Sequence, residues 1–342
     1  MRATDQPATD RPAADLGTVG VPIAEVTRCD VRTGDHVVES RHLGHVAVTG
    51  PDGRVEAALG LPDRPIFVRS TAKPFQATAC LELLDLAGGS PSPAEIAVSW
   101  ASHRGEGRHV DAVRQLLHRS GTAPDHLTCP VDRPEADPGA TPARLWHNCS
   151  GKHALFALAG LHQGTSRERL LDPDGPLQRV VLEVLDEVLG PPAALGVDGC
   201  GAPAVAVPLT ALARGYGALA SGDRWRRVRD AGLTHPALVG GEGRLESALL
   251  GAGVVAKVGA EGVYAAGWLD RLGQPHGIAV KATDGSPRGA AALLRDTLVE
   301  LEVVPADVWS PPPPLGGGRP AGEVRSVRTA VDALVAGVGR RG

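Results

Sequence analysis

Hydrophobic and polar positions alternate with a period of two near the start of the chain and recur at helical spacing through its middle. The alternating stretches predict strands, and a Pro-Asp-Gly turn between the last two predicts an antiparallel meander. Apolar residues three and four apart predict helices. The predicted strands cover residues 36–39, 44–49 and 54–59, and the predicted helices cover residues 73–86, 109–118, 152–162, 176–189, 204–219 and 288–301.

Strands return towards the end of the chain. Apolar runs at 262–268 and 277–281 flank a polar stretch and predict a β-hairpin. An Asp-Gly turn then leads into the last long helix, and 324–331 predicts an edge strand or a helix. This order predicts an α/β (α+β) fold. We expect a mostly antiparallel sheet from both chain ends, with a helical lobe over roughly 71–250 between them.

Length, charge and composition favour a globular protein that acts on a small molecule. The chain has 342 residues, 42% of them apolar, and a formal net charge of −4, without the basic patch that nucleic acid requires. No stretch approaches ~20 uninterrupted apolar residues, so we expect no contact with a membrane. Residues 1–20 lack the apolar core of a signal peptide and predict a flexible tail. Five widely spaced cysteines indicate a reducing compartment, which favours the cytoplasm.

Lysine is scarce, with four residues among the 35 lysines and arginines. Arginine cannot be deprotonated in a protein, whereas a partly buried lysine can lose its proton and act as a base or a ligand. A bias towards arginine could have left four lysines by chance, but chance would scatter them over solvated helix faces. Three of the four lie instead in motifs rich in Ser, Gly, Cys or His, which indicates chemical roles. The lysines are Lys73, Lys152, Lys257 and Lys281.

The motif Ser70-Thr-Ala-Lys73 lies at a predicted helix start. A spacing of three places both side chains on one helical face, and the helix N-terminus favours the anion that forms after attack. A desolvated, neutral lysine can activate a serine as a nucleophile. The alternative is an N-cap serine followed by an exposed lysine.

A second polar segment, Ser99-Trp-Ala-Ser-His-Arg-Gly-Glu106, directly follows an apolar run. Ser102 and His103 could act as acid, base or hydrogen-bond donors, because active-site groups commonly lie where a regular element opens into a loop. Glu106 could instead cap the next helix. On this segment alone, capping is the favoured interpretation.

Two turns of small residues each carry a cysteine, Cys149 and Cys200. Their thiolates could form a zinc site with an open position, together with His153 or a neutral Lys152. A nucleophilic pair of Cys149 and His153 is an alternative, as are two buried, structural thiols.

The two remaining lysines each follow an apolar strand. Lys281 is the better functional candidate, because the turn after it leads into a helix start, where backbone donors gather. Lys257 has a simpler interpretation as a lysine that protects a sheet edge.

These motifs together resemble the Rhizobium etli type, or thermolabile, L-asparaginase family, in the family's order and over about residues 22–335. The matching segments are Val38-Glu-Ser40 with Gly44-His-Val-Ala-Val48, Arg69-Ser-Thr-Ala-Lys-Pro-Phe-Gln76, Ala101-Ser-His-Arg-Gly-Glu106, Asn148-Cys-Ser-Gly-Lys-His-Ala154, Val197-Asp-Gly-Cys-Gly-Ala-Pro203, His235-Pro236, Lys257-Val-Gly-Ala-Glu-Gly-Val263 and Lys281-Ala-Thr-Asp-Gly285. The resemblance implies a fold like that of serine β-lactamases and penicillin-binding proteins, a single catalytic domain over 21–342, and a homodimer.

The resemblance also implies hydrolysis of L-asparagine to L-aspartate and ammonia through an acyl-enzyme. It implies two catalytic pairs in one pocket, Ser70 with Lys73 and Ser102 with Lys281. It further implies a zinc ion bound by Cys149, Lys152 and Cys200. Supporting or substrate-binding roles fall to Arg69, His103, Asn148, His153 and Asp198.

Two other classes of function stay open at this stage. Another Ser-x-x-Lys amidohydrolase, acting on a β-lactam or a peptide, would share the serine chemistry, although Lys281 is followed by Ala-Thr-Asp rather than by Thr-Gly. A protein that binds zinc without catalysis would share the cysteines.

Overall fold

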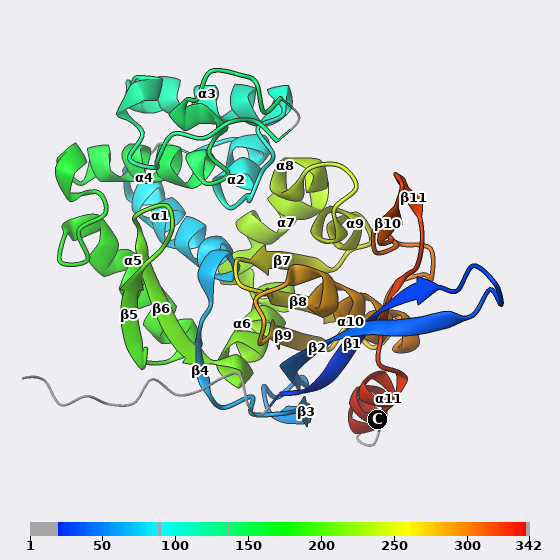
Figure 1. The fold of residues 1–342 in the computed structure, drawn as a ribbon. Coiled ribbons are helices and arrows are strands. Elements are labelled where there is room, and N and C mark those ends of the chain that lie inside the picture. The colour runs from blue at the N-terminus through cyan, green and yellow to red at the C-terminus, as the bar shows by residue number, and fades with distance from the viewer. Residues whose placement is uncertain (1–19, 88–89, 136, 340–342) are drawn as a thin grey trace, which may run out of the picture.

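A seven-stranded antiparallel sheet joins the two ends of the chain, in the computed structural model that describes residues 20–87, 90–135 and 137–339 (Figure 1). The strand order is β12-β1-β2-β9-β8-β7, with β3 paired to β2. This confirms the predicted sheet, while the predicted tail at 1–20 lies outside the described residues except for its last position. The strands are β1 (Val21–Cys29), β2 (His36–Thr49), β3 (Val55–Leu59), β7 (Val255–Gly259), β8 (Val263–Leu269), β9 (Pro275–Ala282) and β12 (Val324–Ser326).

The helices lie between β3 and β7 and again after β9. In Figure 1 the first five gather away from the large sheet, beside a small sheet of order β4-β6-β5. None of the described helices is both long and apolar enough to cross a membrane. The helices are α1 (Lys73–Ala87), α2 (Pro93–Ser99), α3 (Gly107–Ser120), α4 (Ser150–His162), α5 (Pro176–Leu189), α6 (Leu209–Ser221), α7 (Arg226–Thr234), α8 (Pro236–Gly240), α9 (Leu245–Gly251), α10 (Pro287–Glu300) and α11 (Arg328–Val338), and the short strands are β4 (Pro65–Phe67), β5 (Ala194–Val197), β6 (Pro203–Pro208), β10 (Leu315–Gly316) and β11 (Arg319–Pro320).

Both faces of the central strands are buried, by different helices. Ala47, Ala279 and Ala265 lie opposite one another across β2, β9 and β8 and belong to the core of the helical part. The small side chains of these three alanines let α6 approach the sheet closely. A Cβ at Gly277 of β9 would lie 1.9 Å from the carbonyl oxygen of Ala213 in α6. The alternate positions on these strands form a second core with α10 and α11.

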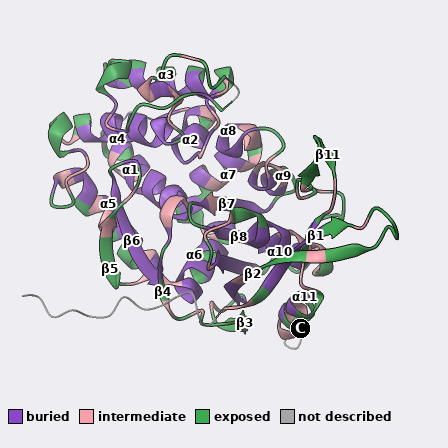
Figure 2. Cartoon of the chain, viewed as in Figure 1, coloured by how far each residue is buried: buried purple, intermediate pink, exposed green. Residues whose placement is uncertain are grey.

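One predicted helix is wrong over its first third. The prediction was a helix over 204–219, but 203–208 forms the buried strand β6 and the helix begins at Leu209. A buried strand shows no polar alternation, so the Ala-Val-Ala-Val run resembles a helix. Pro208 supplies the missing signal, because a residue before proline favours extended backbone. Figure 2 shows β6 buried beside the exposed β5.

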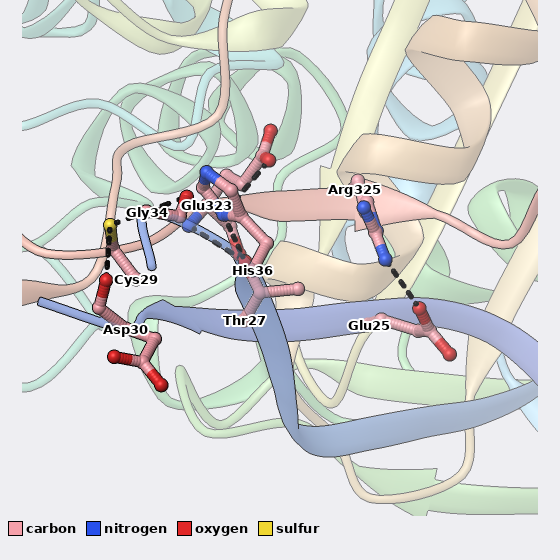
Figure 3. A network of polar contacts seen from close by, with 8 residues as sticks. All are labelled: Glu25, Thr27, Cys29, Asp30, Gly34, His36, Glu323 and Arg325. Carbon is pink, nitrogen blue, oxygen red and sulfur yellow. Dashed lines mark hydrogen bonds and ion pairs between the residues drawn. The ribbon is translucent and has the colours of Figure 1, made fainter. Parts of the chain in front are cut away.

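Polar contacts accompany the pairing of the C-terminal strand β12 with β1 (Figure 3). Arg325 donates to Glu25 at 3.3 Å, and His36 Nδ1 lies 3.0 Å from Thr27 Oγ1 and 3.1 Å from Glu323 Oε1. Exposed pairs of this kind contribute about 0–1 kcal/mol each. The backbone ladder and the packing of Val324 against Ala24, Val26 and Ala292 therefore carry most of the attachment of β12 to the sheet.

Candidate active site

A cavity of about 820 Å³ is lined by segments of both the helical part and the large sheet. It brings together several residues that the sequence singled out, from three separate segments of the chain. Those that line it are Ser70, Ser102, His103 and Asn148. The two cysteines of the predicted zinc site do not line it, and neither does Lys73, although Ser70 and Lys73 share a small adjoining cavity with Arg69, Lys152 and Asp198.

Ser70 lies in a 3-10 turn, Arg69–Ala72, that runs directly into α1, as the sequence predicted. The residue before it, Arg69, has φ = +52°, a left-handed conformation that a side chain with a Cβ rarely adopts. Arg69 Nε donates to Asp198 Oδ1 at 2.8 Å, and this ion pair fixes the strained residue. Backbone strain of this kind often accompanies functional sites, because the surrounding structure must maintain it.

Lys73 is almost fully buried, with 1% of its surface exposed. Its Nζ donates to the carbonyl oxygen of Ala101 at 2.5 Å and to Ser102 Oγ at 3.1 Å. Both acceptors are neutral. The hydrogen bond therefore joins Lys73 to Ser102, whereas the sequence paired Lys73 with Ser70.

Lys281, the predicted partner of Ser102, makes different contacts. Its Nζ donates to the carbonyl oxygens of Glu261 and Ala282. Burial lowers the pKa of Lys281, although the nearby charges of Glu261 and Asp284 oppose this. Lys281 thus anchors the turn at residues 260–262, which forms part of the cavity wall.

Cys149, Lys152 and Cys200 lie together, as the resemblance implies. Lys152 Nζ lies 3.1 Å from Cys200 Sγ. A hydrogen bond with Cys200 holds the pKa of Cys149 well below its usual range, against burial and with help from the charges of Lys73 and Lys152. The same contact and burial raise the pKa of Cys200, so Cys149 is the more acidic of the two thiols.

Burial and the neighbouring acidic groups have opposite effects on Lys152. Burial opposes the ammonium form, but the charges of the cysteines and of Asp198 outweigh it and raise the pKa of Lys152. The neutral lysine expected at this position therefore requires a bound cation that displaces its proton.

Asp198 joins this cluster to Ser70. Burial alone would raise the pKa of the Asp198 carboxyl, but the charges of Lys152 and Arg69 lower it. The carboxylate therefore stays ionised between two cations. It lies 3.5 Å from Cys200 Sγ and 2.8 Å from Arg69 Nε.

The two predicted histidines are buried and neutral. The backbone N–H of Gly105 donates to His103 Nδ1 at 3.1 Å, so Nε2 carries the proton and donates to Ser150 Oγ at 2.9 Å. Burial lowers the pKa of His103 and reduces that of His153 to about 4. Both ring nitrogens of His103 are thus occupied, which suits a supporting role better than proton transfer.

The donors of the predicted zinc site fit a metal ion. In the described part of the chain, no group of three or more His, Cys, Asp or Glu side chains is arranged to hold a metal. The predicted set is different, because its third ligand is a lysine. His153 Nε2 is buried and has no hydrogen-bond partner among the described residues. The buried His153 nitrogen and the thiols of Cys149 and Cys200 are donors that a metal ion could bind.

Gly151 explains the small residues of the motif around Lys152. A Cβ at this position would lie 2.1 Å from the carbonyl oxygen of Val98. Helix α4 can therefore approach α2 only with glycine here. We expect Gly151→Ala to lower the free energy of unfolding by about 1–3 kcal/mol, measured by urea denaturation. Gly164→Ala is a poorer comparison because its φ is +63°, whereas Gly107→Ala meets no atom within 4 Å and should change stability little.

Lys257 is more buried than the interpretation as an edge lysine implied. The strand β7 is at the edge of the sheet, but Lys257 is fully buried and lies opposite Ala265, in the row that faces the helical part. Burial lowers its pKa to about 7, although Glu246 opposes the shift. A buried amine with such a pKa beside a cavity is a functional candidate rather than an edge lysine. The sequence does not show which elements pack over a strand. Only the scarcity of lysine in the chain therefore drew attention to Lys257.

No curated protein matches this chain. The chain is similar to solved structures described as "Crystal Structure Analysis of Mglu in its native form", at 21% identity over 76% of this chain and 65% of that chain with a TM-score of 0.38, and "Crystal Structure Analysis of Mglu in its glutamate form", at 17% identity over 78% and 62% with a TM-score of 0.37. The chain thus spans less than two thirds of those chains. Likenesses this low support no argument about function.

The match to a family model is much more extensive. The model of L-asparaginase II matches residues 30–326. This range includes the cavity, both serines, all four lysines and the cysteine pair, and it runs from the turn after β1 to the last residue of β12. The chain therefore belongs to the L-asparaginase II family.

Proposed function

We propose that this chain hydrolyses L-asparagine to L-aspartate and ammonia, with Ser70 as nucleophile and Lys73 as base. The family supports an amidohydrolase of the asparaginase type. The observation that carries the finer proposal is the hydrogen bond of 3.1 Å between Lys73 Nζ and Ser102 Oγ at the wall of the cavity that Ser70 also lines. A buried amine bonded to one serine, which shares a small cavity with a second, is suited to moving protons during acyl transfer.

In the proposed reaction, Ser70 Oγ attacks the side-chain amide carbon and its proton passes to the Lys73 amine. Ser102 accepts a hydrogen bond from Lys73 and can pass that proton to the departing nitrogen, so that ammonia leaves and an ester remains. Water then attacks the ester carbon and gives a proton to Lys73, which returns it to Ser70 as L-aspartate is released. Backbone N–H groups must stabilise the oxyanion in both steps.

We also propose a zinc ion held by Cys149, Lys152 and Cys200. When bound, it would supply a fixed positive charge near the Arg69 and Asp198 pair, and these residues would orient the substrate. The donor set and the unpaired His153 Nε2 support this assignment. A serine β-lactamase-like fold, a homodimer and a cytoplasmic location belong to the same proposal.

Zinc binding can be tested without activity. We expect about one zinc ion per chain after dialysis, measured by mass spectrometry of the metal, because thiolates bind zinc strongly. Cys149→Ser and Cys200→Ser should each lose it. Cys29→Ser is the matched control, since this thiol is exposed on β1, and it should retain zinc. A wild-type chain that stays free of zinc in micromolar zinc would contradict the proposal.

The overall function is tested by an ammonia assay on L-asparagine and L-glutamine, with a penicillin-like acylating probe in parallel. We expect ammonia from L-asparagine and no stable acylation by the probe. Ammonia from neither amide, together with acylation, would favour the β-lactam alternative. Stoichiometric zinc without any turnover would favour a non-catalytic metal-binding protein.

A further inference from the structure

Four arginines of the described residues line the cavity, and three of them already have acceptors within the protein. Arg104 and Arg244 both contact the carboxylate of Glu135, at 3.0 and 2.6 Å. Arg133 donates to the carbonyl oxygen of Ala140. These three are therefore part of the wall and are poorly placed to bind a second anion.

The fourth arginine, Arg288, lies in the first turn of α10 and has a different environment. Its Nε donates to His42 Nε2 at 2.9 Å. No acceptor among the described residues bonds its two terminal Nη groups. The guanidinium is thus held at one edge, while the edge formed by the two Nη groups is available. That edge matches the two oxygens of a carboxylate.

A relay through the buried ring of His42 to the half-exposed Asp284 holds Arg288 in this orientation. Because Arg288 Nε can only donate, His42 Nε2 must carry a lone pair. The ring proton is therefore on Nδ1, which donates to Asp284 Oδ2 at 2.5 Å. His42 is 3% exposed, so few other partners are available to it. Asp284 thus sets the tautomer of His42, and His42 in turn holds the arginine.

Gly289 fixes the histidine ring against the helix. A Cβ at position 289 would lie 2.6 Å from His42 Cβ and 2.7 Å from His42 Cγ. The ring can therefore pack on the first turn of α10 only because residue 289 is a glycine. The sequence drew attention to Asp284 as part of a turn, but it gave no role to His42 or Gly289.

Ser70 and Arg288 line the same cavity, and one hairpin turn contacts the segments that carry them. A Cβ at Gly259 would lie 3.3 Å from Thr71 Cγ2, beside Ser70, and a Cβ at Gly262 would lie 3.0 Å from the carbonyl oxygen of Ser286. Residues 259 and 263 pair across β7 and β8. Paired Cα atoms lie about 5 Å apart, so the turn that lies between the segments of Ser70 and Arg288 is narrow.

We propose that Arg288 binds the α-carboxylate of the substrate, and that Asp284 and His42 are positioning residues for it. This inference rests on the proposed function, in which the side-chain amide of the same amino acid lies at Ser70. It makes the enzyme selective for amides that carry a free carboxylate at the other end. Amides without that carboxylate, and peptides in which it is blocked, offer no acceptor to the two Nη groups of Arg288 and should bind more weakly.

The experiment compares two substrates, L-asparagine and 3-aminopropanamide, which is asparagine without its carboxylate. In Arg288→Met we expect kcat/KM for L-asparagine to fall roughly tenfold to a hundredfold, mostly through KM, as is typical when a charged hydrogen-bonding partner is lost. The slow turnover of 3-aminopropanamide should not change. Arg328→Met removes an exposed arginine of α11 and is the matched control.

The relay is tested with His42. We expect His42→Ala to raise KM for L-asparagine severalfold with little change in kcat, and His42→Gln to recover part of the loss, because its side-chain oxygen can accept from Arg288. Gly289→Ala should act like His42→Ala without removing any polar group. A purely structural role would instead lower activity on both substrates together.

Two outcomes would overturn the inference. One is an Arg288→Met variant that handles L-asparagine like the wild type, and the other is an equal loss on both substrates. Binding of L-aspartate, measured by calorimetry, separates this failure from that of the proposed function. If the wild type releases no ammonia, the proposed function fails, and Arg288 is then judged by whether Arg288→Met weakens L-aspartate binding.

Discussion

Lys73→Met will reduce ammonia release from L-asparagine by roughly 10²- to 10⁴-fold, the range for loss of a positioned general base. Methionine has a similar length and no proton acceptor of comparable basicity, so the variant leaves the buried space filled. The loss should be in kcat, because Lys73 Nζ donates to Ala101 and Ser102 inside the wall rather than into the open cavity. Steady-state kinetics with purified protein measure it.

Lys73→Arg should lose almost as much activity, because arginine keeps the charge but cannot take a proton. Unchanged stability in urea would show that the variant is folded. If Lys73→Arg or Lys73→Met kept more than about a tenth of the wild-type kcat, Lys73 would not be the base.

The two serines can be separated in the same experiment. Ser70→Ala should prevent formation of the acyl-enzyme, whereas Ser102→Ala should still form it, more slowly. Intact-protein mass spectrometry after rapid acid quenching distinguishes the two cases. An ester on Ser102 in the Ser70→Ala variant would reverse their roles, which is a real alternative because Ser102 is the hydroxyl bonded to Lys73.

Local signals in the sequence predicted most of the regular elements. The helix after Ser70, the hairpin that ends at Lys281 and the cysteine turns all have strong local chemistry. Short helices such as α8 and the edge strand β5 have few residues and weak periodicity, so they were missed. The sheet from both chain ends followed from the order of elements alone.

Pairings within the site could not be predicted, because they depend on contacts between distant segments. The spacing of Ser70 and Lys73 suggested a bond between them, yet the lysine bonds to Ser102, brought in by the end of α2. Arg69 adopts positive φ, for which an arginine gives no local signal. His42 and Arg288 are 246 residues apart, and the fold alone brings them together.

The largest expected effect on stability comes from Lys257. Burial lowers its pKa to about 7 in the folded chain, against a usual 10.5. Between these values the unfolded chain binds more protons, so the free energy of unfolding rises with pH by up to about 1.4 kcal/mol per pH unit. Below about pH 7 both states are protonated and the full cost of burying the ammonium remains. The cost disappears as the pH approaches 10.5.

Lys257→Met should therefore stabilise the protein at pH 7, by about 2–4 kcal/mol, and flatten the rise in stability between pH 7 and 10. The gain in stability stays below the full cost of burying the ammonium, because the charge of Glu246 favours that ammonium. In Lys257→Met, Glu246 loses its cationic partner. Urea denaturation at several pH values measures the difference, and Arg328→Met should retain the wild-type slope.

Lys257→Met should also lose activity, since a buried amine that destabilises the fold is retained against its own cost. If the free energy of unfolding of the variant rose with pH as steeply as that of the wild type, Lys257 would not be the titrating group. Full activity would contradict a functional role for Lys257.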